Sequence, residues 1–336
     1  MKNFVSLLVI FYAFLAQGYV YASEGKAGGK EGNEKTEESR IEPFKSQYTI
    51  APYFAHFTLG LAFQNPTLDT TLTYETDDPL TAGMKVGVND YELAISTGIF
   101  DVFKRRQGQS FKFNYDYYGQ NFSLGIGAFA TDRLVLKGIT RTDSSEEADL
   151  VSQQASNLRS DLLVTSYNLT GIYLFSPEKF SLKSALTYAE RQKRSGGSAL
   201  LGFNVDHIRL KSSNGLFNEE GIIEADGFAN LNRVDMTGVS ISGGYGFTWV
   251  FRPKWNLTVG GLNGLILQRI VYRDDKSSSS LSQSGFDFRT FNSLGYNGDN
   301  FFCGFAAQGW QRYSRVRRQV IGVSGRQLYF FSGTRF

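Results

Sequence analysis

The two histidines are the side chains best suited to acid–base chemistry near neutral pH, because an unperturbed imidazole titrates there. His56 and His207 are the only ones in the sequence. A hydrolytic His–Ser pair on a strand needs both side chains on one face and within hydrogen-bond reach, which a spacing of two residues provides. Ser213 lies six positions after His207 and starts the turn-forming run Ser-Asn-Gly. We therefore expect no catalytic residue.

Carboxylates gather at three places that could be considered for a metal ion. They are Asp77 with Asp78, Asp274 with Asp275, and the run between Asp143 and Asp149. Ca²⁺ requires six or more oxygen ligands, and none of these runs has the spacing of a calcium-binding loop. The pattern predicts solvated loop charge, with no metal site and no cofactor.

A cationic cluster at Arg191, Lys193 and Arg194 is the predicted contact for phosphate groups at a membrane rim. An arginine side chain matches phosphate geometry with two parallel hydrogen bonds. An ordinary loop and a row of lumen charges are the alternatives. The same alternatives hold for a second cationic run, Arg312, Arg315, Arg317 and Arg318.

The N-terminus has the layout of a secretory signal peptide. Lys2 is followed by an apolar run from Phe4 to Leu15 and then by Gly18-Tyr-Val-Tyr-Ala22, in which Val20 and Ala22 stand where signal peptidase requires small or apolar residues. We predict a signal peptide over residues 1–22, with cleavage between Ala22 and Ser23. A membrane anchor is the alternative, but the apolar run is shorter than the ~20 residues that span a bilayer.

The composition of the chain after residue 22 excludes several classes of protein. Residues 23–45 are almost devoid of apolar side chains, which predicts a flexible polar periplasmic lead-in to a domain over residues 46–336. No later apolar stretch reaches the length of a transmembrane helix. The single cysteine, Cys303, excludes an intramolecular disulfide, and 35 basic against 32 acidic residues give no reason to expect a nucleic-acid partner.

From residue 53 onward, apolar residues recur with a period of two, which is typical of β-strands. The chain is also rich in strand-forming aromatics, with 29 Phe and 18 Tyr. In the clearest segment, Phe111, Phe113, Tyr115 and Tyr117 alternate with Lys112, Asn114 and Asp116. Such alternation between an apolar face and a small or charged polar face suits a barrel wall between lipid and a polar lumen. A soluble secreted β-protein is the alternative.

Short turns and long polar loops divide these strands. Short turns are predicted at 89–90, 119–121, 176–179, 252–254 and 297–300, and long loops at 101–109, 140–160, 211–235 and 273–283. This asymmetry predicts an antiparallel up-and-down transmembrane barrel of a Gram-negative outer membrane. The count of crossings between Gly197 and Asp235 is ambiguous, because Phe180 to Leu210 can be one bent arm, giving 12 strands, or a further strand near Ile222 can give 14. We favour 12.

The C-terminal Phe336 closes the last alternating segment. An aromatic residue at the end of a terminal strand is the signal that the outer-membrane assembly machinery reads, so we expect that machinery to be a partner.

The chain resembles a family of uncharacterised outer-membrane barrels that is known as a domain of unknown function. The resemblance covers most of the chain after about Tyr48, and it implies a barrel but supplies no activity or site residue. It rests on Tyr118-Gly-Gln-Asn-Phe122, Lys137-Gly138, Arg159-Ser-Asp161, Lys179-Phe-Ser181, the run from Gln192 to Ser198, Gly244-Tyr-Gly-Phe247, Lys254-Trp255, Gly295-Tyr-Asn297 and the closing Gly333-Thr-Arg-Phe336.

The sequence thus predicts a monomeric barrel in the outer membrane, with membrane lipids and lipopolysaccharide as partners. We expect a small pore or a surface-binding protein without catalysis. A lipid-modifying barrel enzyme and a structural barrel with a plugged lumen are the alternatives.

Overall fold

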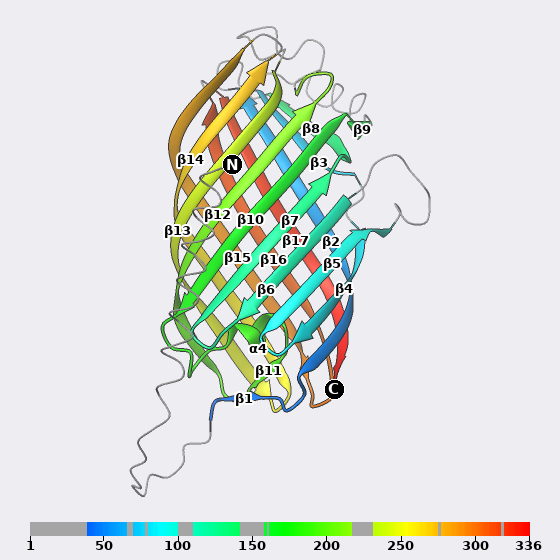
Figure 1. Cartoon of the computed structure of the whole chain (residues 1–336), viewed down its shortest axis with the longest axis vertical. Coiled ribbons are helices and arrows are strands. Elements are labelled where there is room, and N and C mark those ends of the chain that lie inside the picture. Colours follow the sequence, from blue (N-terminus) through cyan, green and yellow to red (C-terminus); the bar gives the residue numbers. More distant parts are fainter. Residues whose placement is uncertain are drawn as a thin grey trace, which may run out of the picture. The chain divides into compact units, whose positions relative to one another are not determined.

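The alternating segments form antiparallel strands that close into a barrel in the computed structural model (Figure 1). The structure describes residues 39–65, 70–77, 80–99, 110–141, 158–159, 161–216, 231–274, 277–316 and 319–336. Twelve strands make the ring, and the pairing of the last with the first closes it. In ring order they are β2 (Tyr48–Asn65), β4 (Leu80–Val88), β5 (Tyr91–Gly98), β6 (Ser110–Tyr118), β7 (Phe122–Thr131), β10 (Leu162–Leu174), β12 (Gly196–Ser212), β13 (Leu231–Arg252), β14 (Trp255–Asp274), β15 (Ser278–Asn297), β16 (Phe301–Val316) and β17 (Gln319–Arg335). The prediction of a 12-stranded up-and-down barrel is confirmed.

The two ends of the barrel differ. Tyr48 and Phe336 exchange backbone hydrogen bonds of 3.2 and 3.1 Å where β2 begins and β17 ends. We call this the terminal end, and the opposite end, where β2 finishes at Asn65, the distal end. The turns between β4 and β5, β6 and β7, β13 and β14, and β15 and β16 all lie at the terminal end. All four match short turns predicted from the sequence.

Phe180 to Leu210 do not form one bent arm as predicted, because only β12 from this stretch belongs to the wall, but the favoured count of 12 strands is correct. Residues 175–195 instead form a segment at the terminal end that contains α4 (Leu182–Leu186) and β11 (Glu190–Gln192). The Ser181 hydroxyl caps α4 by accepting a hydrogen bond from Ser184 N. We call residues 175–195 the plug, because the side chains of Phe180, Leu182, Ala185 and Tyr188 are buried against inward-facing wall residues.

Two further features of the chain differ from the sequence prediction. β1 (Ile41–Pro43) pairs with β11, so the end of the predicted lead-in forms a strand. The predicted long loop at 273–283 is wrong for most of its length, because β14 and β15 remain paired out to Arg273 and Ser278. The consecutive serines 278–280 begin β15, which is polar on both faces there. Among the described residues, no helix is long and apolar enough to cross a membrane.

The wall contains a fork between β2 and β10. The terminal half of β2 pairs with β4, whereas its distal half pairs with β3 (Thr70–Thr76). β3 then pairs with β8 (Leu134–Arg141), which in turn pairs with β9 (Leu158–Arg159). The hairpin of β5 and β6 therefore belongs to the terminal half of the wall only. In the distal half β3 and β8 pair directly, so the wall there has two strands fewer. At the fork, Arg133 donates a 2.9 Å hydrogen bond to Asp77.

The outer face of the barrel is apolar. Leu267 and Phe286 are 70% and 69% exposed, and the outward apolar residues of β13 from Val239 to Phe251 are exposed as well. At about 3.4 Å per residue and a tilt near 45°, that run spans roughly 30 Å, close to the ~25 Å band of a transmembrane barrel. Near the terminal end, outward aromatics contact one another in the pairs Tyr48–Phe336, Tyr91–Tyr117, Tyr117–Phe122, Tyr173–Phe175, Phe251–Trp255 and Trp255–Tyr296.

The lumen is packed in layers. In β2 the apolar face points inward, contrary to the expectation of a lipid-facing apolar side and a polar lumen side. Phe57, Leu59, Leu61 and Phe63 join buried side chains from β3, β8, β10, β12, β13, β14 and β17 in one cluster in the distal half, which we call the distal core. The plug and its wall contacts fill the terminal end, and polar side chains lie between the two.

The distal core gives a stability prediction. Leu61 is fully buried in it, so Leu61→Ala leaves a cavity and should lower the free energy of unfolding by about 2–5 kcal/mol. Leu267→Ala is the matched control, because a lipid-facing site leaves no cavity and should cost less. Denaturant unfolding in lipid would measure both; an equal loss would contradict a packed distal core.

Candidate functional site

The two histidines do not meet a serine in a catalytic arrangement. His56 is exposed on the outer face of β2, with Nδ1 3.5 Å from Thr58 Oγ1. His207 lies on β12, with Nδ1 2.9 Å from Thr237 Oγ1 and Nε2 3.5 Å from Asp235. The two histidines thus lie on strands that are not neighbours in the ring.

The predicted phosphate contacts lie at the terminal end, in and just after β11. Arg191 pairs with Asp299 at 2.5 Å and with Glu42 at 3.4 Å, and Lys193 lies 3.9 Å from Glu42. Hydrogen bonds from Lys254 and Arg191 lower the pKa of the Asp299 carboxyl to about 2, so the carboxylate stays charged at any physiological pH. At least Arg191 and Lys193 are therefore engaged with the chain's own carboxylates.

The remaining predicted sites are Phe336, the second cationic run, and residues that lie outside the described part of the chain. Phe336 stacks on Tyr48 with ring centroids 6.0 Å apart, at the end of β17. Of the second cationic run, Arg312 points into the lumen and Arg315 is exposed. The cleavage site at Ala22 and Ser23 lies outside the described residues, as do the acidic run at 143–149 and Arg317 with Arg318.

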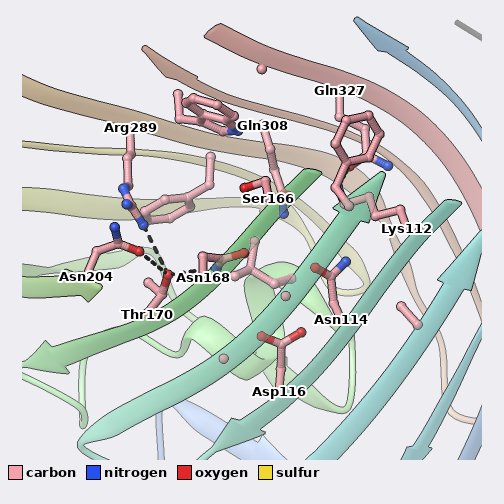
Figure 2. A pocket seen from close by; sticks show the side chains of 18 of the residues that line it. Lys112, Asn114, Asp116, Ser166, Asn168, Thr170, Asn204, Arg289, Gln308 and Gln327 are labelled. Atoms are coloured by element: carbon pink, nitrogen blue, oxygen red, sulfur yellow. Dashed lines mark hydrogen bonds between the residues drawn. The ribbon is translucent and has the colours of Figure 1, made fainter. Parts of the chain in front are cut away.

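A polar chamber lies in the lumen between the distal core and the plug (Figure 2). It is a cavity of about 310 Å³. Its lining includes Lys112, Asn114, Asp116, Ser166, Asn168, Thr170, Asn204, Asp206, Arg289, Gln308, Trp310, Arg312 and Gln327. These side chains come from β6, β10, β12, β15, β16 and β17, so ring closure alone brings them together.

Buried charges on one wall of the chamber compensate one another. Arg312 on β16 donates to Asp206 on β12 and, at 3.3 Å, to Asp287 on β15. The three side chains are at most 5% exposed. Ser240 donates a further 2.9 Å hydrogen bond to Asp287. Further hydrogen bonds reduce the cost of burying such charges, although the buried Nε of Arg312 has no hydrogen-bond partner in the described part of the chain.

The same network continues around the lumen through Arg289 and the neutral side chains of Thr170 and Asn204. Arg289 donates to Asp287 and to the Thr170 hydroxyl, both at 3.1 Å. Thr170 donates to Asn204 at 3.0 Å, and Asn204 donates to Asp206 at 2.6 Å. Figure 2 shows the Thr170 hydroxyl as the point where Arg289, Asn168 and Asn204 converge. The hydrogen bonds thus form a closed ring across four strands.

The opposite wall, on β4 to β6, is less fully paired. Lys85 and Glu92 form a 3.2 Å ion pair. Lys112 donates to Gln327, and its ammonium lies 5.1 Å from the centre of the Phe57 ring. The side chains of Asn114 and Asp116 make no hydrogen bond or ion pair with any other residue that the structure describes. Two charged groups of the chamber, Lys112 and Asp116, therefore stand outside any ion pair of the described residues.

Glycines on the neighbouring strand make room for these side chains. Gly127 and Gly125 on β7 are opposite Asn114 and Asp116 in the strand register. A Cβ atom at Gly125 would collide with the Asp116 carboxylate, and one at Gly127 would collide with Asn168. Both glycines keep the chamber open.

Of the chamber residues, the sequence pattern pointed to Arg312 in a cationic run and to Lys112, Asn114 and Asp116 as the polar face of one strand, but it predicted no site that joins them. A usable signal was present, since polar residues recur two apart on the inward face in pairs such as Asn204 with Asp206 and Asp287 with Arg289. Period-two alternation cannot tell which pairs from distant strands will share one level of the barrel.

The ring makes a prediction about stability. Arg312→Met should lower the free energy of unfolding by about 3–5 kcal/mol, because it removes the cation paired with the buried Asp206 and one of the two cations paired with Asp287. Asp116→Asn should cost much less, since Asp116 has no partner to lose. Denaturant unfolding in lipid measures both changes, and equal effects would show that the ring is not a stabilising unit.

The barrel can now be compared with known proteins. The family model described as Domain of unknown function (DUF4421) matches residues 38–336. No curated protein sequence matches the chain. Among solved structures, the chain is similar to the outer membrane protease OmpT of Escherichia coli, with 9% identity and a TM-score of 0.39 over 87% of this chain and 98% of that one.

Two other solved structures are also similar. The toluene transporter TodX of Pseudomonas putida has 8% identity and a TM-score of 0.28, over 86% of this chain and 90% of that one. Ail, the attachment invasion locus protein of Yersinia pestis, has 10% identity and a TM-score of 0.23, over 87% and 99%. The family resemblance noted in the sequence is confirmed by the family model, which spans the whole barrel: the chain belongs to the family described as Domain of unknown function (DUF4421).

Proposed function

We propose that this protein is an outer-membrane barrel with a closed lumen that binds a small polar solute in its chamber, and that it is not an open pore. The observation that carries the proposal is the layering of the lumen. The distal core spans the barrel on one side of the chamber, and the plug fills it on the other. A chamber of about 310 Å³ is at the lower end of the ~300–1,000 Å³ typical of small-molecule sites.

The plug is held by specific contacts, which supports a closed resting state. Lys183 pairs with Asp90 at 2.6 Å, and Ser293 donates to the Ala185 carbonyl at 2.7 Å. Tyr188 is fully buried and has a φ of 59°, a left-handed conformation that costs a bulky residue energy. Its hydroxyl lies 3.3 Å from Asn256. A strained residue at this position suits a segment that moves to admit a solute.

Location in the outer membrane is supported by the outer surface. The aromatic contacts near the terminal end correspond to the interfacial girdle of outer-membrane barrels, and short turns mark the periplasmic side of such barrels. We therefore assign the terminal end to the periplasm and the distal end to the cell exterior. The C-terminal Phe336, at the periplasmic end of β17, suits recognition by the assembly machinery.

The closed lumen is tested by conductance. The barrel inserted in a planar bilayer should carry no steady ionic current, because the apolar distal core excludes hydrated ions. Insertion is verified with a variant in which Leu59, Leu61 and Phe63 are replaced by Ser and residues 176–195 by a short turn. That variant should conduct. A steady current through the unaltered protein would refute the proposal.

Lipopolysaccharide is proposed as a partner at the distal end. Lys211, Arg233 and Arg273 are opposite one another in the register of β12, β13 and β14. Each shares the outward face of its strand with lipid-exposed residues such as Phe203, Val239 and Leu267. Like charges directly opposite one another destabilise a sheet, so the trio suits an external anion such as the phosphates of lipid A.

Neighbouring charges add to this basic patch. Asp235 is paired with Arg209 and Arg233, at 2.6 Å each. Lys211, Arg269 and Arg273 have no ion pair with any acidic residue in the described part of the chain. The patch has an excess of positive charge on the side of the barrel that we assign to the outer leaflet.

Replacing Lys211, Arg233 and Arg273 together by Ala should weaken binding of lipopolysaccharide by about 100-fold, since each cation near a charged membrane surface contributes about 1 kcal/mol. The matched control replaces Arg191, Lys193 and Arg194 by Ala at the opposite end, and should leave affinity unchanged. Binding of purified protein to lipopolysaccharide at fixed salt measures both. Loss of binding in the control alone would favour the cluster predicted from the sequence.

A further inference from the structure

We infer that the solute of the chamber is a short zwitterionic peptide, with its ammonium group at Asp116 and its carboxylate at Lys112. This inference rests on the proposed function, because it names the chemical class of ligand for the same chamber. It follows from which charges of the chamber are already compensated and which are not.

Most charges at the chamber satisfy one another. Arg289 and Arg312 are balanced by Asp206 and Asp287 in the hydrogen-bonded ring. Lys85 is balanced by Glu92 at 3.2 Å. These groups have no net charge to offer a ligand, so they form the walls of the site.

Lys112 and Asp116 differ from these groups because neither forms an ion pair within the described residues. The Lys112 ammonium donates to the neutral side-chain oxygen of Gln327 and faces the ring of Phe57. The Asp116 carboxylate has no side-chain hydrogen bond within the described residues, and the cations that act on it are the more distant ammonium groups of Lys112 and Lys85. A charge held away from water without a counter-charge is costly, so the chamber should bind a solute that provides one charge of each sign.

The spacing of the two charges favours a peptide over a single amino acid. Lys112 and Asp116 lie four residues apart on the inward face of β6, so their Cα atoms are about 13 Å apart at ~3.3 Å per residue. The Lys112 ammonium is held at Gln327 and forms no ion pair with Asp116. A free α-amino acid has its charged groups on neighbouring atoms, whereas each added residue of a peptide separates them by up to about 3.8 Å.

The amide side chains match the middle of such a ligand. Asn114 lies between Lys112 and Asp116 on the same face, and Figure 2 shows all three directed into the chamber. Asn114 makes no hydrogen bond with another described residue, and Asn168 uses its NH₂ group on Thr170 at 3.2 Å. A side-chain amide can both donate to and accept from a peptide group. A neutral sugar would satisfy the amides but leave both charges uncompensated.

Trp310 provides a reporter inside the chamber. The protein has three tryptophans, and Trp249 and Trp255 are on the outer face, 56% and 39% exposed. Trp249→Phe with Trp255→Phe therefore leaves Trp310 as the only fluorophore of its kind. This variant is refolded from denaturant with each solute present, so that the closed lumen does not prevent entry.

The probes are alanyl-alanine, N-acetyl-alanyl-alanine, alanyl-alanine amide and glucose. Alanyl-alanine should change Trp310 emission saturably, and blocking either its amine or its carboxylate should weaken binding at least tenfold. Asp116→Asn should abolish the preference for the free amine only, and Lys112→Met the preference for the free carboxylate only. Arg326→Ala, on the outer face, is the control and should retain both preferences.

Several results would overturn the inference. Equal binding of free and blocked peptides would do so, as would binding of glucose without binding of alanyl-alanine, or no response to any peptide. If the barrel is silent in bilayers and only the peptides fail, the ligand class is wrong and the closed binding barrel stands. If the unaltered barrel also conducts, the proposed function fails with it.

Discussion

In a closed β-barrel every wall residue faces either the bilayer or the lumen, because side chains alternate along each strand. The lumen face must then be filled by protein or by water. This chain fills it in three layers, with apolar packing at both ends and a polar layer between them. The barrel's packing, its chamber and the closed lumen that we propose all depend on this filling of the interior.

The fork in the wall is part of the same arrangement. On the terminal side of the fork, β5 and β6 widen the ring around the chamber. On the distal side, β3 and β8 pair directly, so the narrower distal half can be filled by aliphatic and aromatic side chains from the wall alone. At the terminal end the wider ring needs additional material, and the plug supplies it. The position of the chamber follows from where the ring is wide and where the plug stops.

The buried charges of the lumen are mostly paired across strands. A buried arginine or aspartate requires partners on other strands, and the ring that includes Arg312 and Asp287 provides them across β10, β12, β15 and β16. β6 departs from this rule, since Lys112 and Asp116 face the cavity without an ion pair among the described residues, and glycines on β7 keep space open beside them. Polar groups that a stable core would have paired are the ones available to a solute.

The sequence by itself determined the barrel and most of its strands, because period-two alternation, tight turns such as Asn89 with Asp90, and the terminal Phe336 are local signals. It could not determine which face of an alternating segment points inward: β2 has its larger apolar residues in the lumen, where the distal core needs volume. Nor could it distinguish Phe180 to Tyr188 as a plug from a strand, because short apolar runs fit both a strand and a helical turn. The chamber was decided by tertiary structure alone, since strand tilt and register bring Asp116, Arg289 and Gln327 to one level from positions far apart in the chain.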